Sequence, residues 1–489
     1  MMKGVAIHIT GIVQGVGFRP WVWKTATRLG LAGTVQNNFD GVRIELYGDA
    51  LGFFQALEND PPPLSRVDSV ATIELTGQAP AGFRILESDR AGEPLQRISP
   101  DIGICADCRK ELFDPADRRH RHPFINCVNC GPRFTIIEGL PYDRPNTSMR
   151  AFAMCDACRA EYANPADRRH HAQPIACPQC GPRVEPADWE TLWLEAITAG
   201  EIVAVKGVGG FHLACDALNA TAVSKLRKRK GRASKPFALM VPNLDWARSV
   251  CHISGAEEKL LLSRERPIVL LKTRSRFPTA ENIAPGLNTL GIMLPYSPMH
   301  EIMFDLFSGP VVMTSANHYS EPMIHENDAA REKLGSVADE FILHDRAIAN
   351  RCEDAVCAVF GDQTRVFRPG RGVAPVSMPI EVEQSVLAFG ADMKNSFALA
   401  HHGQVTLHPY IGDLAHPEAE EILVRSIARQ LDVFHLKPDL IVCDHHPDYF
   451  SSQLARTRAA RDGIPLIETQ HHHAHLVGAC YREAIGFAF

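Results

Sequence analysis

Long apolar stretches are what this sequence most clearly lacks. No segment approaches the ~20 consecutive apolar residues that a bilayer-spanning helix needs, so we expect no membrane partner. The opening residues, MMKGVAIHITG, contain no apolar core typical of a secretory signal, which favours a cytoplasmic protein. Neither charge sign dominates, because 51 Lys and Arg stand against 57 Asp and Glu. With 45% hydrophobic and 22% charged residues, the composition excludes a largely disordered or fibrous chain.

The length and the cysteines indicate several domains and bound metal. At ~150 residues per domain, the 489 residues predict about three domains. Eight of the 14 cysteines form four C-x-x-C pairs. In a long chain without a signal, such pairs indicate metal binding in a reducing cytoplasm rather than a disulfide framework.

The first region, residues 1–92, alternates strands and helices. Apolar periodicity and turn residues predict the order βαββαβ, with strands at 3–9, 31–38, 41–48 and 65–75 and helices at 19–30 and 49–60. This order is typical of a ferredoxin-like sandwich.

The second region, residues 100–185, is an internal repeat of C-x2-C-x18-C-x2-C with a period of 50 residues. DPADRRH in the first copy matches NPADRRH in the second, and CGPR ends both copies. The candidate ligands are Cys105, Cys108, Cys127, Cys130, Cys155, Cys158, Cys177 and Cys180. Four thiolates suit a closed, tetrahedral, structural zinc site, so the array predicts two structural zinc ions. Redox pairs or buried thiols are less favoured alternatives. The spacing leaves interleaved pairing open, although we favour one ion per repeat.

Zinc ribbons often bind nucleic acid, but this region has little positive excess. Residues 105–185 carry 12 Lys and Arg against 10 Asp and Glu, and few aromatics. Binding to a phosphate backbone would favour a basic surface. We therefore expect no nucleic-acid partner and interpret the ribbons as a scaffold between domains.

The third region, residues 188–378, contains the apolar segments EIVAVKG, PFALMVP, PIVLLK and GPVVMTSAN. Buried strands of this kind, alternating with helices, predict an α/β domain. The segment SMPIEVEQS, residues 377–385, is interpreted as a linker, and a fourth region covers residues 385–489.

The string GIVQGVGFR, residues 11–19, predicts an anion site between a strand and a helix. Backbone amides of the loop Gly15, Val16, Gly17 and Phe18 could turn toward an anion, and Arg19 could bind a phosphate bidentately. The string resembles the acylphosphatase signature, as does GTVQNNFDGV at 33–42. By this resemblance Arg19 binds phosphate and Asn37 orients the attacking water, with Asn38 as a less favoured candidate.

A basic cluster at 225–235 holds seven Lys or Arg among eleven residues. It could be a solvated or targeting patch, or a clamp for a triphosphate. The neighbouring strings KGVGGFHL, LPYSPMH, MTSAN and RPGRG resemble the YrdC-type domain, whose relatives make carbamoyl-adenylate from ATP. Matching nucleotide-site positions are Lys206, Arg229, Lys235, Thr314, Ser315, Asn317 and Arg368.

The fourth region contains FGADMKNSFALA at 389–400, suited to a phosphate loop, and QHHHAH at 470–475. His471 and His475 are four residues apart and share one helical face, as a metal-binding pair requires. Both strings resemble the TsaD-like domain of the actin/Hsp70 type, in which the metal also needs an acidic ligand late in the chain.

The four modules in this order resemble the HypF family, the carbamoyltransferases of [NiFe]-hydrogenase maturation. The resemblance implies carbamoyl phosphate and ATP as substrates, the latter with Mg²⁺, and a divalent metal at the histidine pair. It also implies transfer of the carbamoyl group to the C-terminal cysteine of the protein HypE. The family's last domain continues beyond the histidine pair, so we expect its second lobe to be absent and the final transfer to fail.

Two alternatives from other classes stay open at this stage. YrdC-like and TsaD-like domains also occur in threonylcarbamoyl-adenosine synthesis, which suggests a zinc-ribbon protein that binds RNA and modifies tRNA. That alternative leaves the acylphosphatase motif unexplained. The other is a truncated, inactive scaffold, which predicts zinc binding without turnover.

Overall fold

The structure is a computed structural model that describes residues 2–89, 97–274, 280–318 and 321–484. The chain divides into two compact units, Met1–Pro182 with Asp432–His435, and Arg183–Leu431 with Leu436–Phe489. Along the described residues, no helix is both long and apolar enough to cross a membrane.

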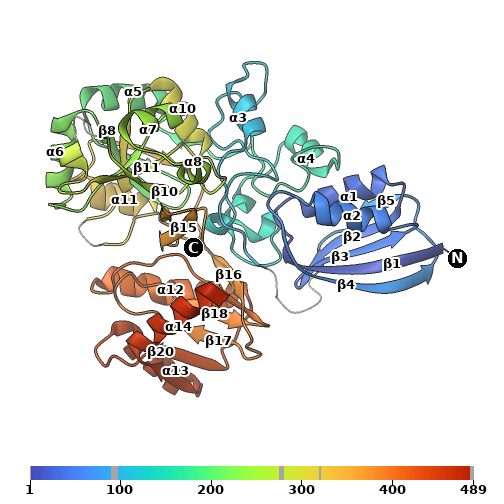
Figure 1. Ribbon diagram of the computed structural model, residues 1–489. Helices are drawn as coiled ribbons and strands as arrows, with labels where there is room; N and C mark the ends of the chain where they lie inside the picture. Colours follow the sequence, from blue (N-terminus) through green and yellow to red (C-terminus); the bar gives the residue numbers. More distant parts are fainter. Residues whose placement is uncertain (1, 90–96, 275–279, 319–320, 485–489) are drawn as a thin grey trace. The chain divides into compact units, whose positions relative to one another are not determined.

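The first unit begins with a five-stranded sheet in the order β4-β1-β3-β2-β5. Helices α1 (Phe18–Arg28) and α2 (Leu51–Asn59) lie on one face of this sheet (Figure 1). The elements are β1 Met2–Ile12, α1 Phe18–Arg28, β2 Ala32–Asn38, β3 Gly41–Tyr47, α2 Leu51–Asn59, β4 Arg66–Gly77 and β5 Phe83–Ile85. Inward residues of β1, such as Ile7 and Ile9, are fully buried. The predicted ferredoxin-like order is confirmed, and β5, which pairs in parallel with β2, is a strand that the sequence did not indicate.

The cysteine-rich part of the first unit contains only short helices. These are α3 Ala106–Phe113, η1 Phe134–Ile136, η2 Arg144–Asn146, η3 Ser148–Ala151 and α4 Asp156–Ala163. Both α-helices begin directly after the first cysteine of a repeat, because Cys105 and Cys155 are extended N-cap residues. The loops that follow α3 and α4 bring the second C-x-x-C pair of each repeat next to the first pair of the same repeat.

The second unit contains a ten-stranded mixed sheet in the order β15-β14-β10-β11-β9-β12-β8-β7-β13-β6. Its strands are β6 Val184–Glu185, β7 Val203–Lys206, β8 Phe211–Asp216, β9 Ala238–Met240, β10 Ile268–Lys272, β11 Thr289–Met293, β12 Val311–Ser315, β13 Glu340–His344, β14 Val356–Phe360 and β15 Gln363–Arg368. Its helices are α5 Trp189–Ala199, α6 Ala220–Arg229, α7 Leu244–Val250, α8 Gly255–Leu261, α9 Ala280–Ile283, α10 Pro298–Leu306 and α11 Asn327–Leu334. Strands and helices bury one shared apolar core, which confirms the predicted α/β domain.

A six-stranded sheet in the order β16-β19-β18-β17-β20-β21 completes the second unit. Its elements are β16 Val376–Pro379, β17 Val386–Ala388, β18 Ala398–His401, β19 Gln404–Leu407, α12 Pro417–Val433, β20 Leu440–Asp444, α13 Phe450–Asp462, β21 Leu466–Thr469 and α14 His471–Ala484. The prediction of a linker at 377–385 was wrong at its start. Residues 376–379 form β16, which pairs antiparallel with β19 over four residues.

Candidate active sites and metal centres

The eight repeated cysteines form two separate clusters, one from each repeat. In the first cluster, Sγ–Sγ distances are 3.7 Å for Cys105–Cys127, 3.9 Å for Cys127–Cys130 and 3.5 Å for Cys108–Cys130. In the second, Cys155–Cys177 and Cys177–Cys180 measure 3.7 Å, and Cys158–Cys180 measures 3.6 Å.

These distances fit zinc. A tetrahedron with Zn–S bonds of about 2.3 Å has edges of about 3.8 Å. Interleaved pairing between the repeats is therefore ruled out. Each cluster would hold one ion with four thiolates, which leaves no open coordination position, so its contribution is to the stability of the fold. Every cysteine whose side chain the structure describes is a free thiol.

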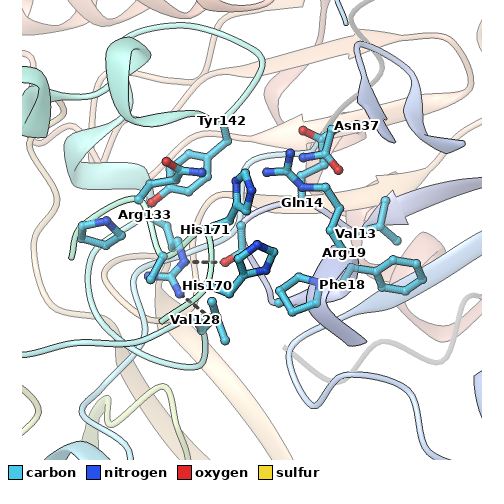
Figure 2. Close-up of a pocket in the computed structure, with 16 residues that line it drawn as sticks. Val13, Gln14, Phe18, Arg19, Asn37, Val128, Arg133, Tyr142, His170 and His171 are labelled. Carbon is cyan, nitrogen blue, oxygen red and sulfur yellow. Dashed lines mark hydrogen bonds between the residues drawn. The ribbon is translucent and has the colours of Figure 1, made fainter. Parts of the chain in front are cut away.

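The predicted phosphate loop joins β1 to α1 and surrounds a small pocket in the first unit (Figure 2). Gly15 and Gly17 have φ values of 70° and 77°, which favour glycine. A Cβ atom at Gly15 would lie 2.9 Å from a ring carbon of Tyr142, so this glycine is also required by close packing. Gly15, Gly17 and Phe18 line the pocket, whereas Val16 is buried in the core and is not part of the pocket wall.

Arg19 and Asn37, the two predicted catalytic residues, both line this pocket. With its amide oxygen turned toward Arg19, Asn37 accepts hydrogen bonds from Arg19 Nε at 3.1 Å and Nη2 at 3.2 Å. Arg19 Nη1 also donates to Ser88 Oγ at 3.1 Å. Asn38 is equally buried but does not line the pocket, so the geometry favours Asn37.

The cysteine-rich part contributes the opposite wall of this pocket, which sequence reasoning missed. Arg133 Nε donates to Gly15 O at 2.7 Å and so holds the phosphate loop. Asp143 Oδ1 lies 3.4 Å from Arg19 Nη2 and accepts a hydrogen bond from Gln173 Nε2 at 3.2 Å. The ribbons therefore do more than separate domains, because their residues line the pocket of the predicted phosphate loop.

A second cavity, of about 690 Å³, lies in the second unit. Its volume falls in the range of pockets that hold a small organic ligand. Five of the predicted nucleotide-site residues line it: Lys235, Thr314, Ser315, Asn317 and Arg368. The same cavity is lined by Lys230 and Arg232 from the basic cluster and by Lys394 from the predicted phosphate loop of the fourth region.

The structure places the other two predicted residues away from this wall. Lys206 Nζ donates to His344 O at 2.9 Å, and burial lowers the pKa of Lys206 to about 8. Arg229 Nη1 donates to Asp339 Oδ1 at 2.7 Å. Lys206 is the last residue of β7 and Arg229 the last of α6, and these contacts hold both side chains outside the cavity wall.

The cations that do line the cavity are held by specific partners. Lys230 Nζ donates to Ser315 O at 2.6 Å and Asn317 O at 2.7 Å, while Arg232 Nη1 donates to Thr314 Oγ1 at 3.0 Å. Burial lowers the pKa of Lys230 to about 7 and that of Arg232 to about 10. A bound polyanion would favour the charged form of Lys230, and Arg232, already charged at neutral pH, would attract it as well.

The histidine pair of the fourth region has the arrangement of two ligands to one ion. His471 Nε2 and His475 Nε2 lie 3.2 Å apart at the start of α14. His471 Nδ1 lies 2.6 Å from Asp444 Oδ2 at the end of β20. A carboxylate that contacts the other ring nitrogen fixes the orientation of a metal-binding histidine. This geometry would let His471 and His475 serve as two ligands of a divalent metal, with Asp444 as an orienting partner that sequence reasoning missed.

Family models match four consecutive parts of the chain. They are described as Acylphosphatase at residues 5–85, HypF finger at 104–137 and 154–185, Telomere recombination at 195–370, and HypF Kae1-like domain at 381–483. The carbamoyltransferase HypF of Rhodobacter capsulatus is 46% identical over 503 residues, covering 99% of this chain and 66% of the relative. The chain belongs to the HypF family.

Further comparisons extend over nearly the whole of this chain. Carbamoyltransferase HypF2 of Cupriavidus necator is 45% identical and covers 96% of this chain and 63% of the relative. A crystal structure of full-length HypF in a phosphate- and nucleotide-bound form matches with a TM-score of 0.93 at 42% identity, covering 97% of this chain and 64% of that one. The chain thus spans slightly less than two thirds of the length of these HypF proteins.

Proposed function

We propose that this chain carries out the early reactions of a HypF carbamoyltransferase and takes part in the last. The sequence of reactions is hydrolysis of carbamoyl phosphate, formation of carbamoyl-adenylate with ATP, and transfer of the carbamoyl group to the C-terminal cysteine of HypE. The observation that carries the proposal is the convergence of Arg19 and Asn37 at a glycine-rich anion loop, in a chain of this family.

The first reaction would take place at the Arg19 pocket. The guanidinium and the loop amides would bind the phosphoryl oxygens, while the Asn37 amide would orient a water toward phosphorus. Water attack breaks the bond between phosphorus and the acyl oxygen and releases phosphate and carbamate. The contact of Arg19 with Asp143 is long, at 3.4 Å, so an incoming phosphoryl group would displace it at little cost.

The second reaction would take place in the larger cavity of the second unit. A carbamate oxygen would attack the α-phosphorus of ATP, which enters with Mg²⁺, and pyrophosphate would leave. Lys230, Arg232 and Lys235 would offset the charge that develops on the leaving pyrophosphate. Arg368 Nη1 donates to Glu353 Oε2 at 2.9 Å, which keeps that guanidinium at the cavity wall.

The last reaction would involve the fourth region and the partner protein. His471 and His475, with Asp444 behind them, would hold the divalent metal. The HypE thiolate would attack the carbamoyl carbon and displace AMP, giving the thiocarbamate from which the cyanide ligand is made. Mass spectrometry of the C-terminal peptide of HypE, after incubation with the chain, carbamoyl phosphate and ATP, decides between this step and the failure expected from the sequence. A carbamoylated cysteine supports the transfer, and an unmodified peptide after ATP turnover limits this chain to the first two reactions.

The test of the proposed function is the release of AMP and pyrophosphate from ATP that depends on carbamoyl phosphate. We expect the wild-type chain to show it. Arg19→Ala should abolish the release of AMP and pyrophosphate when carbamoyl phosphate is the substrate. The same variant should retain this release with ammonium carbamate, which bypasses the first site. If the wild-type chain consumes ATP with neither compound, the assignment of the second cavity is wrong.

A further inference from the structure

The two cysteine repeats differ from each other over a short segment after the shared motif. In the first repeat, His120 is followed by Arg-His-Pro-Phe, whereas in the second, His170 is followed by His-Ala-Gln-Pro. The five residues of the second repeat from His170 to Pro174 all line the Arg19 pocket. His120, the counterpart of His170, is exposed and is not part of this pocket. The second repeat therefore departs from the first over the segment that forms the pocket wall.

Two imidazoles of this segment lie in the pocket with unused hydrogen-bonding capacity. Figure 2 shows His170 and His171 among the side chains of the phosphate loop and the cysteine-rich part. Their rings meet edge to face at a centroid distance of 4.4 Å. The Nδ1 atom of each is buried and has no hydrogen-bond partner among the described residues. A buried polar atom without a partner is unfavourable, so a bound ligand that satisfies it gains affinity.

Both imidazoles are neutral at physiological pH. Burial, and next the positive charge of Arg19, lower the pKa of His170 to about 4. Burial, then Arg19 and His170, lower the pKa of His171 to about 3. A neutral imidazole offers one N–H donor and one bare nitrogen acceptor. The wall opposite the phosphate loop therefore presents acceptors as well as donors, beside a strongly cationic group.

We propose that His170 and His171 determine the acyl-group specificity of the Arg19 site by binding the carbamoyl group of the substrate. This inference rests on the proposed function of that site. With Arg19 and the loop binding the phosphoryl end, the acyl end faces the segment 170–174. One imidazole nitrogen accepts from the carbamoyl NH2, and an N–H donates to the carbonyl oxygen.

The proposed contacts explain why a carbamoyl group would be preferred to an acetyl group. Acetyl phosphate has a methyl group where carbamoyl phosphate has NH2, so it cannot satisfy an acceptor nitrogen. A site built to bind an N–H group rejects an analogue without it, because the buried acceptor then stays unpaired. Gln173 does not take this role, since its oxygen already accepts from Arg144 N at 2.8 Å and Tyr162 OH at 2.9 Å.

The test compares kcat/KM for phosphate release from carbamoyl phosphate and from acetyl phosphate. The variants are His171→Phe and His170→Phe, which retain ring volume but remove the nitrogens, and His171→Gln, which retains polarity. We expect each Phe variant to lower the ratio of kcat/KM for carbamoyl phosphate to kcat/KM for acetyl phosphate by about 10- to 100-fold. In His171→Gln, part of the wild-type ratio should be retained. His120→Phe in the first repeat is the matched control and should leave the ratio at its wild-type value.

The outcomes separate this inference from the proposed function. An equal loss for both substrates in the Phe variants means a structural role for the histidines and overturns the inference alone. An unchanged ratio in all three variants overturns it as well. Failure of the wild-type chain to release phosphate from carbamoyl phosphate overturns the proposed function of the site, and the inference with it. Zinc content, measured on every variant, reports whether the second repeat is folded.

Discussion

Arg168 Nη1 lies 3.1 Å from Cys108 Sγ, so a guanidinium of the second repeat donates to a thiolate of the first metal cluster. The relationship is reciprocal, because Arg118 Nη2 of the first repeat lies 3.2 Å from Cys158 Sγ of the second. Arg168 also pairs with Glu111, and Arg118 pairs with Glu161, again across the repeats. Each zinc site is therefore partly built by the other repeat, with contacts related by the period of 50 residues.

These contacts predict that each arginine affects zinc binding at the cluster of the other repeat. A hydrogen bond to a charged group contributes ~1.5–3 kcal/mol, so Arg168→Met should weaken zinc binding at the first cluster by about 10- to 100-fold. Arg118→Met should weaken the second cluster to a similar extent. Competition with a chromogenic chelator, in variants that retain only one cluster, measures each site. If each variant instead weakened the cluster of its own repeat, the crossed contacts would not stabilise the metal.

The number of zinc ions follows from the two cysteine tetrahedra. We expect two zinc ions per wild-type chain after gel filtration. Cys127→Ser should lose about one ion and destabilise the cysteine-rich part, because a structural site contributes folding free energy. Elemental analysis and thermal unfolding of the same samples measure both effects. A folded wild-type chain without zinc would refute the assignment.

Substitutions of Arg19 and Asn37 should have different effects on phosphate binding and on turnover at the first pocket. Arg19→Ala removes a charge-assisted contact to the phosphoryl group and should lower the rate by ~10²-fold or more, with zinc content unchanged. Asn37→Ala should retain phosphate binding and lose turnover, since its proposed role is to orient water. Binding is measured by titration with inorganic phosphate and turnover by phosphate release. Loss of phosphate binding in Asn37→Ala would mean that Asn37 serves Arg19 rather than the water, as their 3.1 Å contact allows.

Local patterns in the sequence were sufficient to identify the modules and the four cysteines of each cluster. The strand and helix periods predicted the order of elements in the first region, and the C-x-x-C spacing predicted the eight metal ligands but not their pairing. Arg19 and Asn37 lie on adjacent elements of one small domain, so a short signature places them together.

Contacts between distant segments could not be predicted in this way. Asp143 meets Arg19 across 124 residues, and Arg133 meets Gly15 across 118, with no period or motif that connects them. In the basic cluster, composition identified the region but not which cations face the cavity, because that depends on where α6 ends. One available signal was overlooked, namely the departure of the second repeat from the first after His170.

Within the basic cluster, the structure predicts unequal effects of neighbouring substitutions. Lys230→Met and Arg232→Met remove cations that line the cavity and should each raise the KM for ATP by about 10-fold or more. Arg229→Met removes a partly exposed pair with Asp339, worth ~0–1 kcal/mol, and should change stability slightly and the KM little. Pyrophosphate release with ammonium carbamate as co-substrate gives the KM values. An Arg229 variant as defective as the Lys230 variant would place Arg229 in the nucleotide site.

His300 should make the second unit less stable in mild acid. This side chain is fully buried in α10, its ring lies 4.5 Å from that of Tyr296, and burial lowers its pKa from 6.5 to about 3. Between those values the unfolded chain binds a proton that the folded chain does not, so stability falls as the pH decreases from about 6.5 toward 3. From pH 7 to pH 5 the loss of unfolding free energy from this one group is ~2 kcal/mol.

The variant His300→Phe keeps a ring of similar shape but cannot take up a proton. Its unfolding free energy should therefore fall less between pH 7 and pH 5 than that of the wild-type chain, as urea titrations at the two pH values would measure. The exposed His473 is the control, and the unfolding free energy of His473→Phe should depend on pH as that of the wild-type chain does. If the unfolding free energies of all three proteins changed equally with pH, His300 would take up its proton in the folded state.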